Sequence, residues 1–238
     1  MDHHKISHNL KDSTFLWRYM DISKFSLLIT QKKIWFSRSD LLGDDHEGSL
    51  PESIINERKL RWSDLKVLNV FERGSKEGRK DFYINCWTLQ NPKSLSMWKI
   101  YTPNAVGVAV KTSIGRLANC FVKKPNDLFE RNQARIEKVT YIDYSTHKDN
   151  NEEFDRFIHK QKAYSYEKEI RFLIFHGSTI NKPPIGKNLE VDLEVLIDEI
   201  YISQQSGEDL HQYIEELLND HGINKKIVIP PFARTPSF

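Results

Sequence analysis

The stretch from Tyr164 to Phe175 (YSYEKEIRFLIF) constrains the fold of this chain more than any other, because three charged residues lead directly into an apolar run. Glu167, Glu169 and Arg171 occupy alternate positions, and side chains at alternate positions share one face of a β-strand. Charges at the mouth of a buried strand need partners, since an unpaired buried charge is strongly destabilising. The three residues therefore form either an internal ion-pair network or part of a site, and the pattern alone favours neither.

The order of strand and helix patterns predicts an α+β fold with mixed, largely antiparallel sheets and flanking helices. The chain opens with a strand, a short helix and a strand, and Asp21 is a typical N-cap for that helix. Because strands and helices do not alternate regularly, a parallel α/β architecture is not indicated. Further strand patterns occur at residues 81–89, 105–112, 134–144, 194–203 and 225–230. Further helix patterns occur at residues 51–61, 63–74, 94–101, 151–164 and 206–222.

The length of 238 residues favours one large domain or one domain with an insertion. We expect a flexible tail at residues 1–13, followed by a single α+β domain at residues 14–232. Residues 44–80 are rich in charges and show little strand pattern, so they are expected to form a helical insertion or a lid. Pro51 is typical of a helix start, and Ser63 is typical of an N-cap for a second helix.

Composition excludes several classes of protein. The formal net charge of +2 offers no whole-chain argument for nucleic-acid or membrane binding. Cys86 and Cys120 are the only cysteines, which indicates neither a disulfide framework nor a zinc module. The N-terminus lacks a signal-peptide pattern and no apolar run has membrane-spanning length, so we expect a cytoplasmic protein without membrane contact. His3, His4 and His8 are interpreted as part of a polar terminus rather than a metal site.

The acidic stretch GDDHEG at residues 43–48 is a second candidate site. Asp44, Asp45, His46 and Glu47 carry ligands of the kind that hold a hard divalent cation or serve a hydrolase. They lack any recognised ligand spacing, which favours a solvated acidic loop, and no metal is expected.

Arg18 and Tyr19 lie in the first strand, in an otherwise apolar and aromatic stretch. An arginine there needs an anionic partner, which is either a carboxylate of this chain, such as Glu169, or a ligand phosphate. Ser37 and Ser39 flank an arginine after the second strand and either contact a ligand or form a turn.

Met97, Trp98 and Tyr101 recur at helical contact spacing. Packing in the core is the usual outcome of this pattern. Stacking of Trp98 and Tyr101 on a base or nicotinamide ring is the alternative that implies a site.

Residues 16–48, 84–110 and 160–175 together resemble an uncharacterised, mostly bacterial family, domain of unknown function 2971. Its members share an opening strand–helix–strand, an Asn-Asp-Pro-Phe-Glu-like loop, a Met-Trp-x-x-Tyr helix and a Lys…Glu-x-Glu-x-Arg stretch. This chain keeps Asp44 and Glu47 of the loop but departs from the family at positions 43, 45 and 46. The family name implies no activity.

Residues 16–39 more distantly resemble the first unit of the ADP-ribosyltransferase fold. That resemblance implies that Arg18 meets the diphosphate of NAD, that Glu169 is the main catalytic carboxylate and that Glu167 assists it. Tyr19, Trp98 and Tyr101 are then expected to contact the cofactor. Ser37 or Ser39 matches the middle motif only loosely, because in Arg-Ser-Glu enzymes that serine lies on a later strand.

These observations lead to three hypotheses. The first is an effector, in bacterial defence or a toxin, that binds NAD and cleaves or transfers ADP-ribose to a protein or nucleic-acid acceptor. The second is a non-catalytic ligand- or partner-binding domain in which Glu167, Glu169 and Arg171 form a structural network. The third is a metal-dependent nuclease or hydrolase centred on Asp44 and Glu47 with their neighbour at position 45. Whether the chain is an enzyme stays open at this point.

Overall fold

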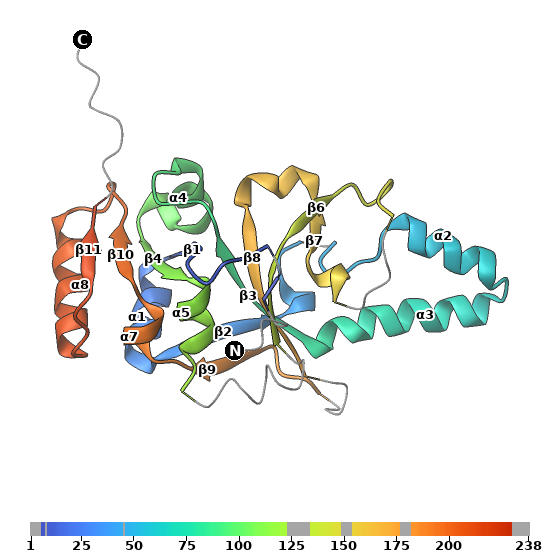
Figure 1. Ribbon diagram of the computed structural model, residues 1–238, viewed down its shortest axis with the longest axis horizontal. Coiled ribbons are helices and arrows are strands. Elements are labelled where there is room, and N and C mark those ends of the chain that lie inside the picture. Colours follow the sequence, from blue (N-terminus) through green and yellow to red (C-terminus); the bar gives the residue numbers. More distant parts are fainter. Residues whose placement is uncertain are drawn as a thin grey trace, which may run out of the picture. The chain divides into compact units, whose positions relative to one another are not determined.

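The computed structural model describes residues 6–7, 9–44, 46–122, 134–148, 154–176 and 182–229. It contains helices together with mixed, mostly antiparallel strands, which confirms the α+β class (Figure 1). The chain divides into two compact units. The first unit comprises residues 1–7, 35–85 and 128–187, and the second comprises residues 8–34, 86–127 and 188–238. Strands β2 (Lys33–Arg38), β3 (Phe82–Thr88) and β9 (Gly186–Glu190) have residues in both units.

In the first unit, β5 (Ala134–Lys138) and β8 (Glu169–Phe175) form an antiparallel pair in which Ile136 lies opposite Phe172. The end of β2 pairs antiparallel with the start of β3, and Ser37 lies opposite Ile84. Strand β8 is buried at its first six positions, as a strand covered on both faces must be. Because β8 is buried, its charged residues Glu169 and Arg171 need partners.

Short elements complete the strands and turns of the first unit. Strands β6 (Thr140–Ile142) and β7 (His159–Gln161) form a parallel pair. The 3-10 helices are η2 (Ser39–Leu41), η3 (Arg79–Asp81), η5 (Asp155–Phe157) and η6 (Lys162–Glu167). Of the predicted N-terminal tail, residues 1–5 and 8 lie outside the described residues, and Ile6 forms a bridge with Ile136.

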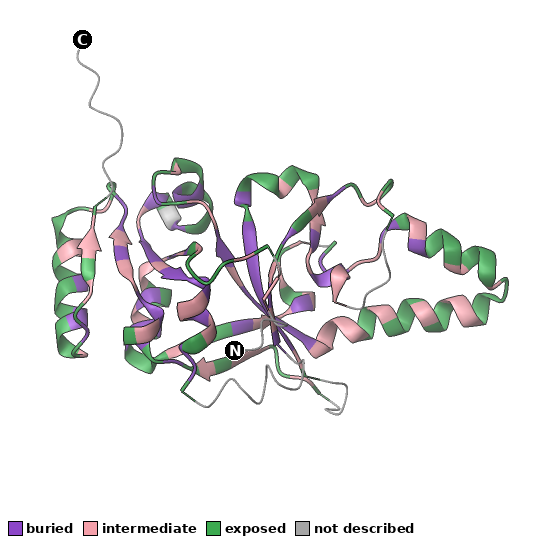
Figure 2. Ribbon diagram, viewed as in Figure 1, coloured by how far each residue is buried: buried purple, intermediate pink, exposed green. Residues whose placement is uncertain are grey.

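Helices α2 (Glu52–Arg61) and α3 (Leu65–Gly78) form a hairpin that extends away from the strands of the first unit (Figure 1). This confirms the two helices expected there, although α3 continues four residues past the predicted end. The rings of Trp62 and Phe71 lie 4.7 Å apart and hold the two helices together. No residue of α3 is buried, as the pink and green ribbon of Figure 2 shows.

The helix expected at residues 151–164 is wrong for its described part. Residues 151–153 lie outside the described residues, and the rest consists of η5, the strand β7 and the start of η6. Phe157 is fully buried, and its ring stacks on that of Phe82 at 3.8 Å. Tertiary packing and the pairing of β7 with β6 have therefore replaced the helix that the apolar spacing favoured.

The second unit is built on β1 (Phe15–Met20), β4 (Val108–Ser113), β10 (Glu199–Ile202) and β11 (Lys226–Val228). The order is β11-β10-β4-β1, with β10 and β11 parallel and the other pairs antiparallel. The end of β3 also pairs with β1, Trp17 lying opposite Thr88. Its helices are α1 (Ile22–Gln31), α4 (Leu95–Tyr101), α5 (Ile114–Asn119), α7 (Leu193–Leu196) and α8 (Glu208–Asp220), with the 3-10 helix η4 (Pro103–Ala105).

Two local details of this unit bear on the sequence patterns. Asp21 caps α1 as expected, because its side chain accepts a hydrogen bond from the N–H of Lys24. The strand expected at residues 194–203 begins only at Glu199, because Asp192 caps the short helix α7 instead. Among the described residues, no helix combines the length and apolar character needed to cross a membrane.

Candidate functional site

The charges that precede and begin β8 do not all lie on one strand. Glu167 ends the 3-10 helix η6, and Lys168 adopts a left-handed conformation with φ of 45°. Strand β8 begins only at Glu169, so the expected alternation on one strand holds for Glu169 and Arg171 but is wrong for Glu167. All three charged residues are nevertheless buried, with exposed fractions of 5%, 4% and 1%.

Arg171 is the centre of the cluster. Its two terminal nitrogens donate to the two carboxylate oxygens of Glu47, and the bond from Nη2 measures 2.8 Å. Its Nε donates to Oε1 of Glu169 at 2.9 Å, and Nη1 also donates to the carbonyl of Phe157 at 2.6 Å. A forked guanidinium–carboxylate pair of this kind is the strongest and most directional form of ion pair.

Lys160 joins the cluster from β7. Its Nζ donates to Oε2 of Glu167 at 2.5 Å and to Oε2 of Glu169 at 3.0 Å. Burial opposes the charge of Lys160, but attraction to Glu169 and Glu167 outweighs it and raises the pKa above the ordinary value. The hydroxyl of Tyr141 accepts the backbone N–H of Glu169 at 2.8 Å and helps to place this carboxylate.

We call Glu47, Lys160, Glu167, Glu169 and Arg171 the charge network. Burial raises the pKa of the Glu47 carboxyl, and the neighbouring Arg171 opposes that shift. The network satisfies the need for partners that the sequence indicated, but two of its members, Glu47 and Lys160, were not expected as partners of the other three. The sequence marks these two residues only through the family resemblance, in which Glu47 belongs to the shared loop and Lys160 to the Lys…Glu-x-Glu-x-Arg stretch.

The acidic loop differs from its expected form. Glu47 is 2% exposed and paired with Arg171, so the expectation of a solvated loop is wrong at this residue. Asp44 is half-buried and accepts the backbone N–H of His46 at 2.9 Å. Asp45 lies outside the described residues. In the part of the chain that the structure describes, no three His, Cys, Asp or Glu side chains are arranged to hold a metal ion.

Arg18 lies on β1 in the second unit and is half-buried. Its guanidinium carbon is 5.9 Å from the centre of the Trp87 ring, and burial lowers the pKa of Arg18. Within the described ranges, no carboxylate forms an ion pair with it. Arg18 and Glu169 belong to different units, so a single site containing both stays a prediction.

Of the three aromatic residues expected to contact a cofactor, Trp98 and Tyr19 pack against other residues of the chain. Trp98 is 1% exposed and donates its indole N–H to the carbonyl of Pro92 at 2.8 Å. Tyr19 packs edge-on against it, with ring centres 4.9 Å apart, and donates to the carbonyl of Asn91 at 2.7 Å. Tyr101 is 40% exposed at the end of α4. The burial of Trp98 fits the core-packing interpretation, whereas the exposure of Tyr101 does not.

The two serines also have local roles. Ser39 is fully buried and donates its hydroxyl to the carbonyl of Arg79 at 2.5 Å, which ties η2 to η3. Ser37 is half-buried on β2, and its hydroxyl makes a long bond of 3.4 Å to the carbonyl of Arg38. Both observations fit the turn-forming interpretation, and ligand contact by either serine stays a prediction.

No protein-family model matches the chain, and no curated protein matches it. Among solved structures, it is similar to DarT of Thermus sp. 2.9 in complex with ADP-ribosylated ssDNA, at 10% identity and a TM-score of 0.42, over 93% of this chain and 96% of that chain. It is also similar to the same protein in complex with NAD+, at 9% identity and a TM-score of 0.39, over 93% and 97% of the two chains. Both TM-scores are low, and the likeness assigns no activity to this chain.

Proposed function

We propose that this chain binds an NAD-type dinucleotide and cleaves it or transfers its ADP-ribose. The proposal rests on the burial of Arg18 and on its lack of a carboxylate partner among the described residues. A half-buried guanidinium has lost part of its hydration, and no carboxylate within the described ranges compensates it. An anion from outside the chain supplies what is missing.

A dinucleotide diphosphate suits Arg18 because its oxygens accept the planar fork of N–H donors in pairs. The nearby face of Trp87 stabilises the cation and limits where the guanidinium can turn. The same residue matches the first-strand arginine that the resemblance to ADP-ribosyltransferases assigns to NAD. The position of Arg18, its charge and its lack of a carboxylate partner among the described residues thus support one ligand class.

The proposed reaction breaks the bond between the ribose C1′ and the nicotinamide nitrogen. The bonding electrons leave with nicotinamide, and the ribose becomes an oxocarbenium-like cation. Glu169 stabilises this cation, Glu167 assists, and water or an acceptor then forms the new bond to C1′ and gives up a proton. Since Lys160 and Arg171 hold Glu169 in the charge network, Lys160, which is the more exposed of the two at 12%, must release it.

A second candidate is non-catalytic binding of the same ligand. It is favoured by the closure of the charge network, in which both oxygens of Glu169 accept hydrogen bonds from Arg171 or Lys160. A carboxylate engaged in this way contributes to the fold and is not free to meet a ribose.

One experiment separates the two. NAD labelled in both its nicotinamide and adenine parts is incubated with the wild type, Glu169→Gln and Arg18→Met, and both binding and nicotinamide release are measured. Catalysis predicts that Glu169→Gln lowers release by at least about 100-fold with binding retained. Arg18→Met is expected to weaken binding by roughly 10- to 100-fold.

Arg135→Met is the matched control, because Arg135 also lies over an aromatic ring, that of Phe154 at 4.1 Å, but in the first unit. It is expected to leave NAD binding unchanged. Binding without release, equal in wild type and Glu169→Gln, supports the non-catalytic candidate. Absence of any NAD binding by the wild type refutes both.

A further inference from the structure

The free end of the α2–α3 hairpin carries a concentration of positive charge. We define the hairpin tip as residues 58–66 (RKLRWSDLK), which span the end of α2, the connection and the start of α3. The basic residues of the tip are Arg58, Lys59, Arg61 and Lys66. The tip contains one acidic residue, Asp64, and four basic residues, so its net charge is +3. This exceeds the net charge of +2 of the whole chain, which is why the overall composition conceals it.

Lys76 of α3 and Lys80 of the adjoining η3 are paired, unlike the charges of the tip. Lys76 bonds Glu72 at 2.6 Å and Lys80 bonds Glu77 at 2.8 Å. No ion pair within the described residues involves any of the four tip cations. Arg58 and Arg61 instead lie over the rings of Phe71 and Trp62, at 5.3 and 4.9 Å, and Arg58 also donates a hydrogen bond to the hydroxyl of Ser75 at 3.2 Å. Two lysines near the base are thus neutralised by carboxylates, whereas the four cations of the tip have no carboxylate partner among the described residues.

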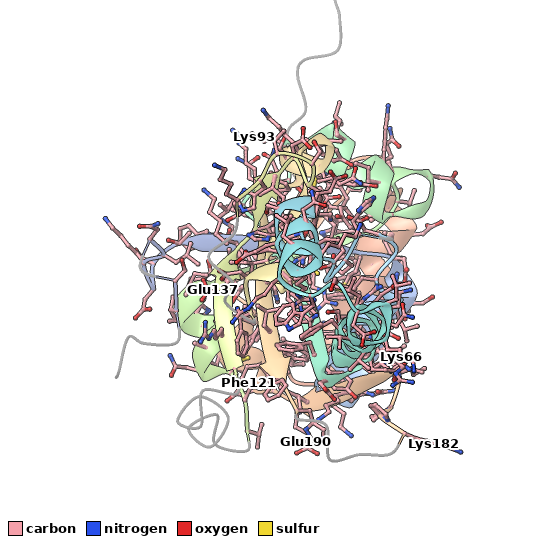
Figure 3. The ribbon with its side chains drawn as sticks, turned by 90° about the vertical axis from the view of Figure 1, so that its right-hand side faces the viewer. Lys66, Lys93, Phe121, Glu137, Lys182 and Glu190 are labelled. Atoms are coloured by element: carbon pink, nitrogen blue, oxygen red, sulfur yellow. The ribbon has the colours of Figure 1, made fainter. Side chains whose placement is uncertain are left out.

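The tip also exposes large apolar side chains. Leu60 is 89% exposed and Leu65 is 74% exposed. They flank the connection at the end of the hairpin that faces the viewer in Figure 3, where the neighbouring Lys66 is labelled. Exposed leucines close in sequence to cations without carboxylate partners give the tip both apolar and positive surface for a partner.

We propose that the hairpin tip binds single-stranded nucleic acid. Its four cations meet backbone phosphates and release counterions, which is the main source of affinity for a polyanion. Leu60 and Leu65 contact the faces of unpaired bases, which a duplex keeps stacked inside. A lipid bilayer suits the tip less well, because Arg61 and Asp64 lie between the leucines and would enter the interface with them. The binding is independent of the proposed function; only the role of this nucleic acid as ADP-ribose acceptor rests on it.

The test measures fluorescence anisotropy of a labelled single-stranded DNA of about 12 nucleotides, without NAD, from about 50 to about 200 mM salt. The tip variant is Lys59→Gln/Lys66→Gln, and the matched control is Lys76→Gln/Lys80→Gln, which removes two paired lysines, one in α3 and one in the adjoining η3. We expect the tip variant to bind about tenfold more weakly and the salt slope to fall by about 1.4, since each lost phosphate contact is worth about 0.7 in the slope. The control is expected to stay within about twofold, and Leu60→Ser to weaken binding about threefold.

Several results would overturn the proposal. They are a wild type that does not bind the strand at low salt, an equal loss in both lysine variants, or equal affinity for a duplex of the same sequence. Tip-dependent binding to vesicles of anionic lipid in place of the DNA assigns the tip to a membrane. Self-association abolished by Leu60→Ser assigns it to a second copy of the chain. Circular dichroism of each variant confirms that the hairpin is folded, and because NAD is absent, failure of the proposed function leaves the result unaffected.

Discussion

Replacement of Arg171 tests the energetic role of the charge network. The side chain is 1% exposed, and it compensates two buried carboxylates, Glu47 at 2% and Glu169 at 4% exposure. Arg171→Met keeps most of the volume but leaves Glu47 without its cation and Glu169 with Lys160 alone. Removal of one partner from a buried pair costs about 3–5 kcal/mol. Because a domain has about 5–15 kcal/mol of stability, this change approaches complete unfolding.

Removal of the opposing charge is expected to restore part of this loss. In Arg171→Met/Glu47→Gln the forked pair is replaced by neutral groups, so we expect the double variant to recover about 1–3 kcal/mol relative to Arg171→Met. The control is Lys76→Met, which breaks the exposed Lys76–Glu72 pair, and it is expected to change stability by less than about 0.5 kcal/mol.

Urea unfolding at pH 7, followed by tryptophan fluorescence and circular dichroism together, measures these differences. Coincident transitions and equal slopes show that each variant unfolds in the same way as the wild type. A loss below about 1 kcal/mol for Arg171→Met would refute the view that Arg171 compensates buried negative charge in the network. A double variant less stable than Arg171→Met would show that the charge left on Glu47 is not what destabilises Arg171→Met.

Two further predictions concern one residue in each unit. Hydrogen bonding from Tyr201, together with Lys111 and Lys226, lowers the pKa of Glu199 from 4.5 to about 2. Its contribution to the free energy of unfolding is therefore present above pH 4.5 and lost as the pH falls towards 2. Glu199→Gln is expected to lower the free energy of unfolding by at most about 3 kcal/mol at pH 7 and to flatten the acid side of a curve of stability against pH. An unchanged acid side of that curve would contradict this prediction. Gly48 has φ of +67°, and a Cβ there would lie 2.8 Å from Cε1 of Phe157. Gly48→Ala should cost about 2–4 kcal/mol in urea unfolding, whereas Gly74→Ala, with nothing within 4 Å of its Cβ, should not destabilise α3.

The residues of the charge network show how far sequence patterns reach. The alternation around Glu169 and the apolar run after it correctly predicted a buried strand whose charges need partners. The partner that matters most for Arg171 is Glu47, 124 positions away, and no local pattern relates them. A short-range rule also failed at Glu167, because the left-handed conformation of Lys168 ends the alternation one residue before the strand.

The aromatic residues show the same limit. Helical spacing indicated that Met97, Trp98 and Tyr101 share one face of a helix; Met97 and Trp98 are buried on α4, but Tyr101 is 40% exposed. Spacing alone does not say whether that face meets the core or a ligand. The hydrogen bond from Trp98 to Pro92 and the edge-on contact with Tyr19 decide for packing in the second unit.

The sequence by itself determined the α+β class, the buried strand β8, the two helices of the hairpin and the requirement that the charges around β8 be paired. These properties follow from periodicity, capping residues and the cost of a buried charge, which act over a few neighbouring residues. Only the tertiary structure decided which charges meet, because distant segments must come together before Glu47 and Lys160 can reach Glu169 and Arg171. The tertiary structure also decided that Arg18 and the cations of the hairpin tip have no carboxylate partner among the described residues. This depends on where every described carboxylate lies, which no single sequence pattern gives.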